Sequence, residues 1–245
     1  MIPKVIHYCW FGNNKLPPLA KKCISSWKKY CPDFQIKEWN EDNFDILSAP
    51  EYVKEAYKVK KWAFVTDYVR LWILYNEGGV YFDTDVELIK SIDALLDYNA
   101  FFGFEDYRLN DKVFVATGLG VGSVKKNEII GAMMNDYENI HFIIDNGEYD
   151  LTPCPQRNSR VLEEKGFVLS GALQVNNGVV LLPSDYLCPI NWQTNVLNIT
   201  ENTISIHHFA ASWKEGKKSR RFKLLVRKII GGKLYDRIRK IIRRV

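Results

Sequence analysis

One segment of the chain, Gly78 to Leu88 (GGVYFDTDVEL), joins a glycine pair to an amphipathic strand pattern. Because alternate residues of a strand share a face, four apolar residues would point to one side and two aspartates to the other. Uncompensated carboxylates beside an apolar strand are costly, so Asp83 and Asp85 are expected to hold a cation. Paired oxygen ligands suit Mg²⁺ or Mn²⁺, which usually keep open positions for substrate phosphates. A solvated edge strand with chance acids is the alternative interpretation.

The segments around this one alternate between strand and helix patterns. Strands are predicted at 4–11, 34–39 and 80–88, helices at 17–31 and 61–76, and further strands around 113–121, 174–182 and 203–209. Such alternation is typical of an α/β fold, a sandwich in which helices cover a largely parallel central sheet.

The composition restricts the class of protein. With 47% hydrophobic and 26% charged residues among 245, the chain is expected to be globular, and no apolar run is long enough to span a bilayer. The first seven residues contain no signal-peptide core, which favours a cytoplasmic location. The five cysteines are odd in number and lack C-x-x-C spacing, so reduced thiols are expected rather than disulfides or a zinc site.

Charge is divided unequally along the chain. Residues 214–245 hold 14 Lys and Arg against two acids, a net charge of +12, whereas residues 1–213 hold 20 bases and 27 acids, or −7. We therefore predict a catalytic domain over 1–213 and a separate basic tail over 214–245.

A second pair of charged residues precedes the glycine pair. Asp67 and Arg70 are spaced i,i+3, which places them on one face of the predicted 61–76 helix. Taken alone, they fit a surface salt bridge that contributes about 0.3–0.5 kcal/mol.

Four motifs in this order resemble the DxD-containing glycosyltransferases of family 32 and, more distantly, the glucosyltransferase domain of the large clostridial toxins. The motifs are Ile6–Gly12 (IHYCWFG), Thr66–Arg70 (TDYVR), Gly78–Asp85 (GGVYFDTD) and His207–Trp213 (HHFAASW). The resemblance implies a GT-A fold, a Rossmann-like nucleotide-diphospho-sugar transferase architecture. It also implies retaining transfer of a sugar from a nucleotide donor, expected to be a UDP-sugar, with Mn²⁺ or Mg²⁺ as cofactor.

The resemblance also assigns roles to individual residues. It implies donor contacts for Trp10, Thr66, Asp67, Arg70, Tyr81, Asp83, Ser212 and Trp213, with Asp67, Arg70, Asp83 and Asp85 in catalytic positions. Trp10 would stack on the donor base, although a core tryptophan is an equally ordinary role for an indole. The implied metal ligands are Asp83, Asp85 and His207, with His208 as the competing imidazole.

The chemistry that follows needs no general acid, because a divalent ion stabilises the charge that develops on the leaving diphosphate. No residue is marked by its context as a nucleophile, so attack from the face that the diphosphate leaves is preferred. The segment 115–122 lacks the asparagine that relatives tend to carry near the sugar, which leaves the sugar contacts open. Glu105, Asp106 and Asp150 are the candidates for binding sugar hydroxyls.

Apolar residues recur at helical spacing in the tail, with Lys and Arg between them. This pattern fits a helix on an anionic membrane, a nucleic-acid contact or a helix packed on the acidic body. The membrane-bound helix is the preferred interpretation. The function expected is a cytoplasmic, peripherally membrane-bound transferase that extends a lipid-linked glycan in bacterial surface polysaccharide biosynthesis, with no nucleic-acid partner. The alternatives are a toxin-like or effector enzyme that glycosylates a protein, and a metal-binding module without catalysis.

Overall fold

The computed structural model describes residues 1–109, 112–191, 194 and 196–210. The chain divides into two units, Met1–Phe209 and Ala210–Val245, and nearly all of the second lies outside the described residues. The predicted basic tail and the predicted donor contacts Ser212 and Trp213 therefore also lie outside them. None of the described helices has the length and apolar character that crossing a bilayer requires.

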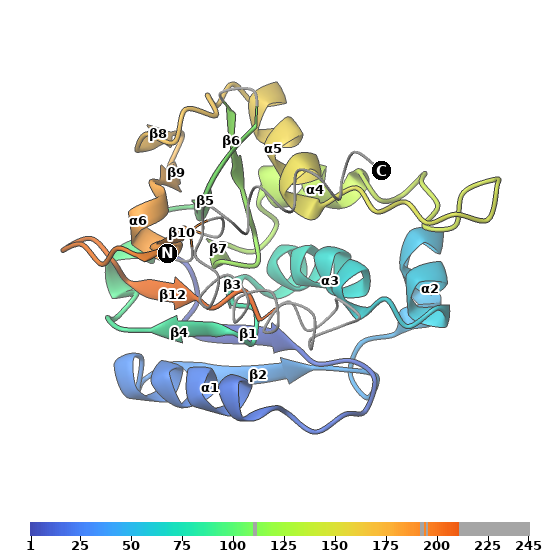
Figure 1. The fold of residues 1–245 in the computed structure, drawn as a ribbon, viewed down its shortest axis with the longest axis horizontal. Helices are drawn as coiled ribbons and strands as arrows, with labels where there is room; N and C mark the ends of the chain where they lie inside the picture. Colours follow the sequence, from blue (N-terminus) through green and yellow to red (C-terminus); the bar gives the residue numbers. More distant parts are fainter. Residues whose placement is uncertain (110–111, 192–193, 195, 211–245) are drawn as a thin grey trace, which may run out of the picture. The chain divides into compact units, whose positions relative to one another are not determined.

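The described residues alternate between helices and strands from the N-terminus onward (Figure 1). The helices are α1 (Pro18–Tyr30), α2 (Glu51–Lys58), α3 (Trp62–Glu77), α4 (Glu128–Asn135), α5 (Cys154–Glu164) and α6 (Ser184–Leu187), with 3-10 turns η1 (Ile46–Ser48) and η2 (Asp93–Leu95). The strands are β1 (Val5–Cys9), β2 (Gln35–Trp39), β3 (Gly79–Tyr81), β4 (Val86–Leu88), β5 (Ala100–Leu109), β6 (Lys112–Val115), β7 (Val121–Ser123), β8 (Gln174–Asn176), β9 (Val179–Leu182), β10 (Ile190–Asn191), β11 (Val196–Leu197) and β12 (Ser205–His207).

A mixed sheet forms the centre of the fold, in the order β2-β1-β3-β7-β5-β9-β8, with β6 paired to β5. The pairs β1–β2, β1–β3 and β5–β9 are parallel, and the pairs made by β7, β8 and β6 are antiparallel. Two small antiparallel sheets, β4–β12 and β10–β11, lie outside it. The predicted α/β class is confirmed.

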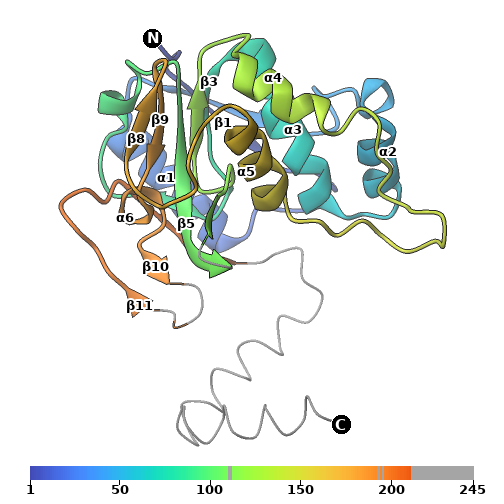
Figure 2. The ribbon, with the colours of Figure 1, turned by 90° about the horizontal axis from the view of Figure 1, so that it is seen from above.

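Two hydrophobic cores cover the two faces of the sheet. Helices α2 to α5 pack on one face and α1 and α6 on the other (Figure 2). The alternation of the strands divides their side chains between the cores: Tyr81 and Phe102 belong to the first, and Val80 and Phe101 to the second. Each strand of the centre is thus anchored on both sides.

The predicted strand 80–88 is wrong in one respect, because the chain turns within it. β3 ends at Tyr81 and β4 starts at Val86, and the amide of Val86 donates to the Asp83 carbonyl across the turn at 3.0 Å. β4 then leaves the main sheet and pairs with β12. Similarly, the predicted strands 113–121 and 174–182 are each two strands joined by a turn.

Candidate metal and donor site

A glycine turn at the end of α3 aims the chain into β3. Gly78 and Gly79 have φ values of 71° and 98°, in the region that favours glycine. A Cβ atom on Gly79 would lie 2.8 Å from Nε2 of His7 and 2.8 Å from the carbonyl oxygen of Val5. The glycine pair is therefore required both by its backbone conformation and by the close approach of β1.

The side chain of His7 stabilises this turn through a hydrogen bond to the Gly78 carbonyl. Trp39 Nε1 donates to His7 Nδ1 at 3.1 Å, so the ring proton is on Nε2, which donates to the Gly78 carbonyl at 3.0 Å. Burial lowers the pKa of His7 to about 4, which keeps the ring neutral at physiological pH. His7 is thus a structural histidine that fixes where β3 begins.

The two aspartates of the DxD motif lie in the turn between β3 and β4. The amide of Asp83 donates to the Gly118 carbonyl at 3.2 Å, and the Tyr81 hydroxyl donates to Asp83 Oδ1 at 3.1 Å. On the other side of the turn, the amide of His208 donates to the Asp85 carbonyl at 3.0 Å. The turn is held by its neighbours on both flanks, which fixes where the two carboxylates point.

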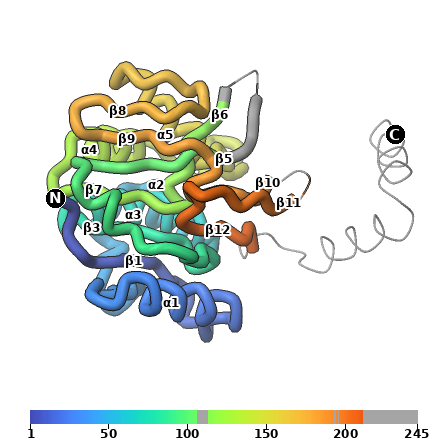
Figure 3. Tube along the Cα trace, turned by 90° about the vertical axis from the view of Figure 1, so that its left-hand side faces the viewer, coloured from blue at the N-terminus to red at the C-terminus, as the bar shows by residue number. Residues whose placement is uncertain are grey.

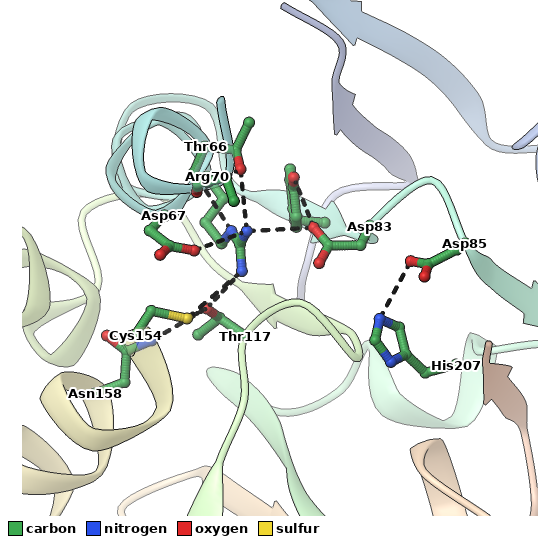
Figure 4. A network of polar contacts seen from close by, with 11 residues as sticks. Thr66, Asp67, Arg70, Asp83, Asp85, Thr117, Cys154, Asn158 and His207 are labelled. Carbon is green, nitrogen blue, oxygen red and sulfur yellow. Dashed lines mark hydrogen bonds and ion pairs between the residues drawn. The ribbon is translucent and has the colours of Figure 1, made fainter. Parts of the chain in front are cut away.

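Strand β12 brings a histidine to these carboxylates. Its antiparallel register with β4 sets His207 opposite Val86, and His207 Nε2 lies 3.2 Å from Asp85 Oδ1 (Figure 4). Asp83, Asp85 and His207 each offer a ligand atom, and these atoms lie within 4.8 Å of one another. This is the one such cluster of three or more His, Cys, Asp and Glu side chains found in the part of the chain that the structure describes.

The donor set of this cluster fits a divalent cation. Two carboxylates and an imidazole are ligands that Mn²⁺ accepts, and the carboxylates also suit Mg²⁺. His207 Nδ1 is buried, and among the described groups it has no hydrogen-bond partner. His208 instead places Nε2 2.8 Å from Oε2 of Glu87, so of the two adjacent histidines His207 is the one that joins the aspartates.

Arg70 connects the metal cluster to helix α3. The side chain is only 4% exposed, and its Nη2 lies 3.0 Å from Asp67 Oδ1 and 3.3 Å from Asp83 Oδ1 (Figure 4). The same guanidinium donates from Nε to the Thr66 carbonyl at 3.0 Å and from Nη2 to the Thr66 hydroxyl at 3.3 Å. The surface salt bridge that the spacing alone suggested is therefore a buried network that holds both carboxylates.

Three residues that the sequence did not single out complete this network. Arg70 Nη1 donates to the Thr117 hydroxyl at 3.3 Å and lies 3.8 Å from Sγ of Cys154, at the start of α5. Asn158, one turn later on α5, donates to the same hydroxyl at 3.1 Å. Contacts between segments so far apart leave no local pattern, and only the burial expected of a cysteine pointed to Cys154.

Burial shapes the charge of these groups. It raises the pKa of the Asp67 carboxyl to about 6, although the Arg70 guanidinium opposes the shift. Burial lowers the pKa of His207, but the carboxylates of Asp85, Asp83 and Glu105 together outweigh it, so that the pKa is raised overall. Burial also raises the pKa of Glu105, a partly buried acid whose charge interacts with His207.

Three further residues were predicted at the site, and the structure describes the side chains of two of them. Trp10 follows β1 directly and is half-buried, with Nε1 donating to the Asn14 carbonyl at 2.5 Å, so it is not a fully buried core residue. Asp150 is paired with Arg157 and accepts a hydrogen bond from the Thr152 amide at 3.0 Å. Its carboxylate is thus already engaged within the protein. The side chain of Asp106 lies outside the described residues.

Part of the chain matches a known family. Residues 17–102 match the model described as "Glycosyltransferase sugar-binding region containing DXD motif". The matched range contains Asp67, Arg70, Asp83 and Asp85, and it ends before Thr117 and His207.

Two curated proteins of Schizosaccharomyces pombe are similar to part of this chain. Inositol phosphoceramide mannosyltransferase 3 is 31% identical over 110 residues, which is 40% of this chain and 28% of that protein. Inositol phosphoceramide mannosyltransferase 1 is 30% identical over 112 residues, 41% of this chain and 33% of that protein. The aligned part thus spans about a third or less of each relative.

Among solved structures, the PaToxG glycosyltransferase superposes with a TM-score of 0.50 at 18% identity, over 67% of this chain and 70% of that one. At this identity the similarity concerns the fold alone. The expected GT-A fold is confirmed.

Proposed function

We propose that the chain is a metal-dependent glycosyltransferase that moves a sugar from a nucleotide-sugar donor to an acceptor hydroxyl. The observation that carries this proposal is the joining of two groups of side chains. The cation ligands Asp83, Asp85 and His207 share Asp83 with the buried network of Arg70 and Asp67. A bare cation site would need the first group only, whereas the second supplies hydrogen-bonding groups next to it, in a chain that matches a DXD sugar-binding region.

In this proposal the chain's own residues position the donor. Trp10 provides an indole face for the donor base, and Asp67 accepts hydrogen bonds from ribose or sugar hydroxyls. Arg70 bridges Asp67 and Asp83 and holds both carboxylates in position, so that neither must reorganise when the donor binds. The segment 212–213 is proposed to contact the diphosphate.

Asp83, Asp85 and His207 are the residues that would hold the ion. When bound, Mn²⁺ or Mg²⁺ supplies positive charge to the diphosphate oxygens as they leave, so a general acid is not needed there. The bond between the anomeric carbon and the diphosphate oxygen breaks, and a bond to the acceptor oxygen forms on the same face of the sugar, which retains configuration. The acceptor proton passes to an oxygen of the released diphosphate.

The acceptor proposed is a glycan on a lipid carrier, in the assembly of a bacterial surface polysaccharide. The basic composition of residues 214–245 supports attachment to an anionic membrane, where each base contributes up to about 1 kcal/mol. The names of the two yeast relatives refer to mannose transfer to a ceramide lipid, which supports a lipid-borne acceptor. A UDP-sugar is the proposed donor, and a GDP-sugar is the first alternative to test.

The proposal is tested by incubating the purified chain with a panel of UDP- and GDP-sugars, with and without Mn²⁺. We expect metal-dependent release of nucleoside diphosphate from one donor, and no release by Asp85→Asn, which keeps the size of the side chain but removes its charge. Analysis of the anomeric configuration of the product by NMR tests retention. Equal turnover by Asp85→Asn and the unmodified chain would refute the metal assignment.

A further inference from the structure

Residues 166–200 are unusual in charge and in exposure. They contain one charged residue, Asp185, in a chain of which 26% is charged. Six of the eleven large hydrophobic side chains that lie exposed among the described residues belong to this segment. They are Val168, Leu173, Val175, Val196, Leu197 and Ile199, which are 47% to 64% exposed.

Three of these side chains gather at one hairpin. Strands β10 and β11 pair only with each other in the described structure, with Ile190 opposite Leu197 and Asn191 opposite Val196. Val196, Leu197 and Ile199, here called the hairpin cluster, are 59%, 47% and 52% exposed. Because consecutive strand residues point to opposite faces, Val196 and Leu197 expose apolar surface on both sides of β11. An isolated two-stranded hairpin gains little from its own pairing, and exposed apolar surface of this kind is typical of an interaction site.

Hydrogen bonds within the protein engage the described polar side chains in and beside the hairpin. The Asn191 side chain accepts hydrogen bonds from the amide and hydroxyl of Thr194, at 2.9 Å and 3.0 Å. The single charge of the segment, Asp185, is tied to the Thr200 hydroxyl at 2.8 Å and the Asn202 amide at 3.1 Å. These polar groups are therefore paired within the protein. The described side chains that lie exposed on this stretch are Val196, Leu197 and Ile199, together with the small polar Thr194 and Asn198.

The base of the hairpin is tied to the strand that ends in the metal cluster. The amide of Ile204 donates to the Tyr186 carbonyl at 2.8 Å, and the Ser205 hydroxyl donates to the Leu187 carbonyl at 3.5 Å. Ser205 is the first residue of β12, and His207 is the last. Figure 3 shows the hairpin and the end of β12 projecting from the same side of the body.

We propose that the hairpin cluster inserts into the surface of a lipid bilayer. A membrane fits better than a protein partner because the chain supplies the second signal that stable membrane attachment requires: the 14 bases of residues 214–245, which follow β12 in sequence. Apolar residues in an uncharged hairpin and bases in a segment later in the sequence match the two layers of an anionic interface, acyl chains and head groups.

A second exposed apolar group in the protein lacks this match. Ile144, Tyr149 and Leu151 are 39% to 58% exposed, but Asp145, Glu148 and Asp150 lie among them. An anionic surface would repel that loop, and this makes it a control within the same chain.

Docking at the hairpin would turn the metal cluster toward acceptors carried by the bilayer. This last step rests on the proposed function, whereas the docking itself does not. The substrate class that it names is a saccharide or polar head group attached to a membrane lipid.

The test uses the full chain and vesicles of phosphatidylcholine with phosphatidylglycerol. Val196→Thr with Leu197→Thr keeps strand propensity but removes apolar surface, and Ile144→Thr with Leu151→Thr is the matched control. We expect the hairpin variant to partition about tenfold or more weaker than the unmodified chain, and the control variant to partition as the unmodified chain does. The difference should persist at high salt, where the contribution of the bases is screened.

Three results would overturn the docking: equal partition of the hairpin variant and the unmodified chain, equal loss in both variants, or no binding of the unmodified chain to any vesicle. Analytical ultracentrifugation compares the oligomeric state of the unmodified chain and the hairpin variant. An oligomer of the unmodified chain that dissociates in the hairpin variant would instead assign the cluster to self-association. Release of nucleoside diphosphate from a soluble donor is measured in parallel and should not change in the hairpin variant. Vesicle binding through the hairpin without any sugar transfer would refute the proposed function and leave the docking intact.

Discussion

Gly118 and Asp83 are so close that a Cβ atom on Gly118 would lie 2.3 Å from Oδ2 of Asp83. The glycine thus leaves the space that the aspartate occupies. The same Cβ atom would lie 3.2 Å from Nη1 of Arg70, so an added methyl group would meet both members of the Arg70–Asp83 ion pair.

We expect Gly118→Ala to displace Asp83 and to reduce metal-dependent turnover by about tenfold or more, as loss of a positioned ligand does. The free energy of unfolding should change less than activity, because a partly exposed carboxylate moves rather than a packed core. Titration of Mn²⁺ and thermal unfolding measure the two effects. Gly131→Ala on α4, which would meet only the ring of Tyr75, is the control and should keep full activity.

The two adjacent histidines are predicted to behave differently. His207→Ala should weaken Mn²⁺ binding by about 10–100-fold or more, because it removes one of the three proposed ligands and loss of an outer-shell partner alone causes a change of that size. His208→Ala removes a partner of Glu87, which is not one of the proposed ligands, and should leave the affinity close to that of the unmodified chain. Calorimetric titration of Mn²⁺ against both variants checks this, and the reverse order would assign the ligand to His208.

Trp10→Ala is expected to weaken binding of a nucleoside diphosphate by about tenfold or more, since a stacked base contributes about 1–3 kcal/mol. Because the indole is half-buried, the fold should survive the change. Titration of UDP in the presence of Mn²⁺ measures the effect, and Trp10→Phe should recover most of it. Equal affinities in folded samples would return Trp10 to a packing role.

His7 is predicted to make stability depend on pH. Its folded pKa of about 4 lies below the unfolded value of about 6.5, so the unfolded chain takes up the proton first as the pH falls. The contribution of neutral His7 to the free energy of unfolding is complete above pH 6.5. It is lost between pH 6.5 and 4, by up to about 3 kcal/mol. The pKa of Asp67, raised to about 6 by burial, acts in the opposite direction over the same range and masks part of this loss.

The test is therefore the difference between variants. Chemical unfolding of the unmodified chain and of His7→Gln between pH 4 and 7 should show that the stability of the variant falls less steeply toward acid. His141→Gln is the control, because the Glu55 carboxylate raises the pKa of that exposed histidine and its effect has the opposite sign. Parallel curves for His7→Gln and the unmodified chain would contradict the assignment.

The sequence was most informative where the site is local. Asp67 and Arg70 lie on one helix, and Asp83 and Asp85 lie a few residues after it, in the turn between β3 and β4. Their patterns predicted both the class of fold and the pairs of residues that come together. The turn between β3 and β4 escaped prediction because Phe82 and Val86, on its two sides, enter the same hydrophobic core. The alternation of apolar residues therefore continues across the turn, as it would in one unbroken strand.

The far side of the site could not be read in the same way. Thr117 and Cys154 contact Arg70 across 47 and 84 residues, and Asn158 contacts Thr117 across 41. A single threonine, cysteine or asparagine carries no local signal. Their role depends on the packing of α5 against the sheet, which only the tertiary structure defines.

The pairing of β12 with β4 has a consequence for how the protein is made. A ribosome delivers the chain from its N-terminus, so Asp83 and Asp85 are available long before His207 has been synthesised. A chain that stops anywhere between them holds two ligands of the cluster and lacks the strand that carries the third. Truncated products would therefore be poor metal binders even if their first strands had already folded, and the complete site would be restricted to chains translated past β12.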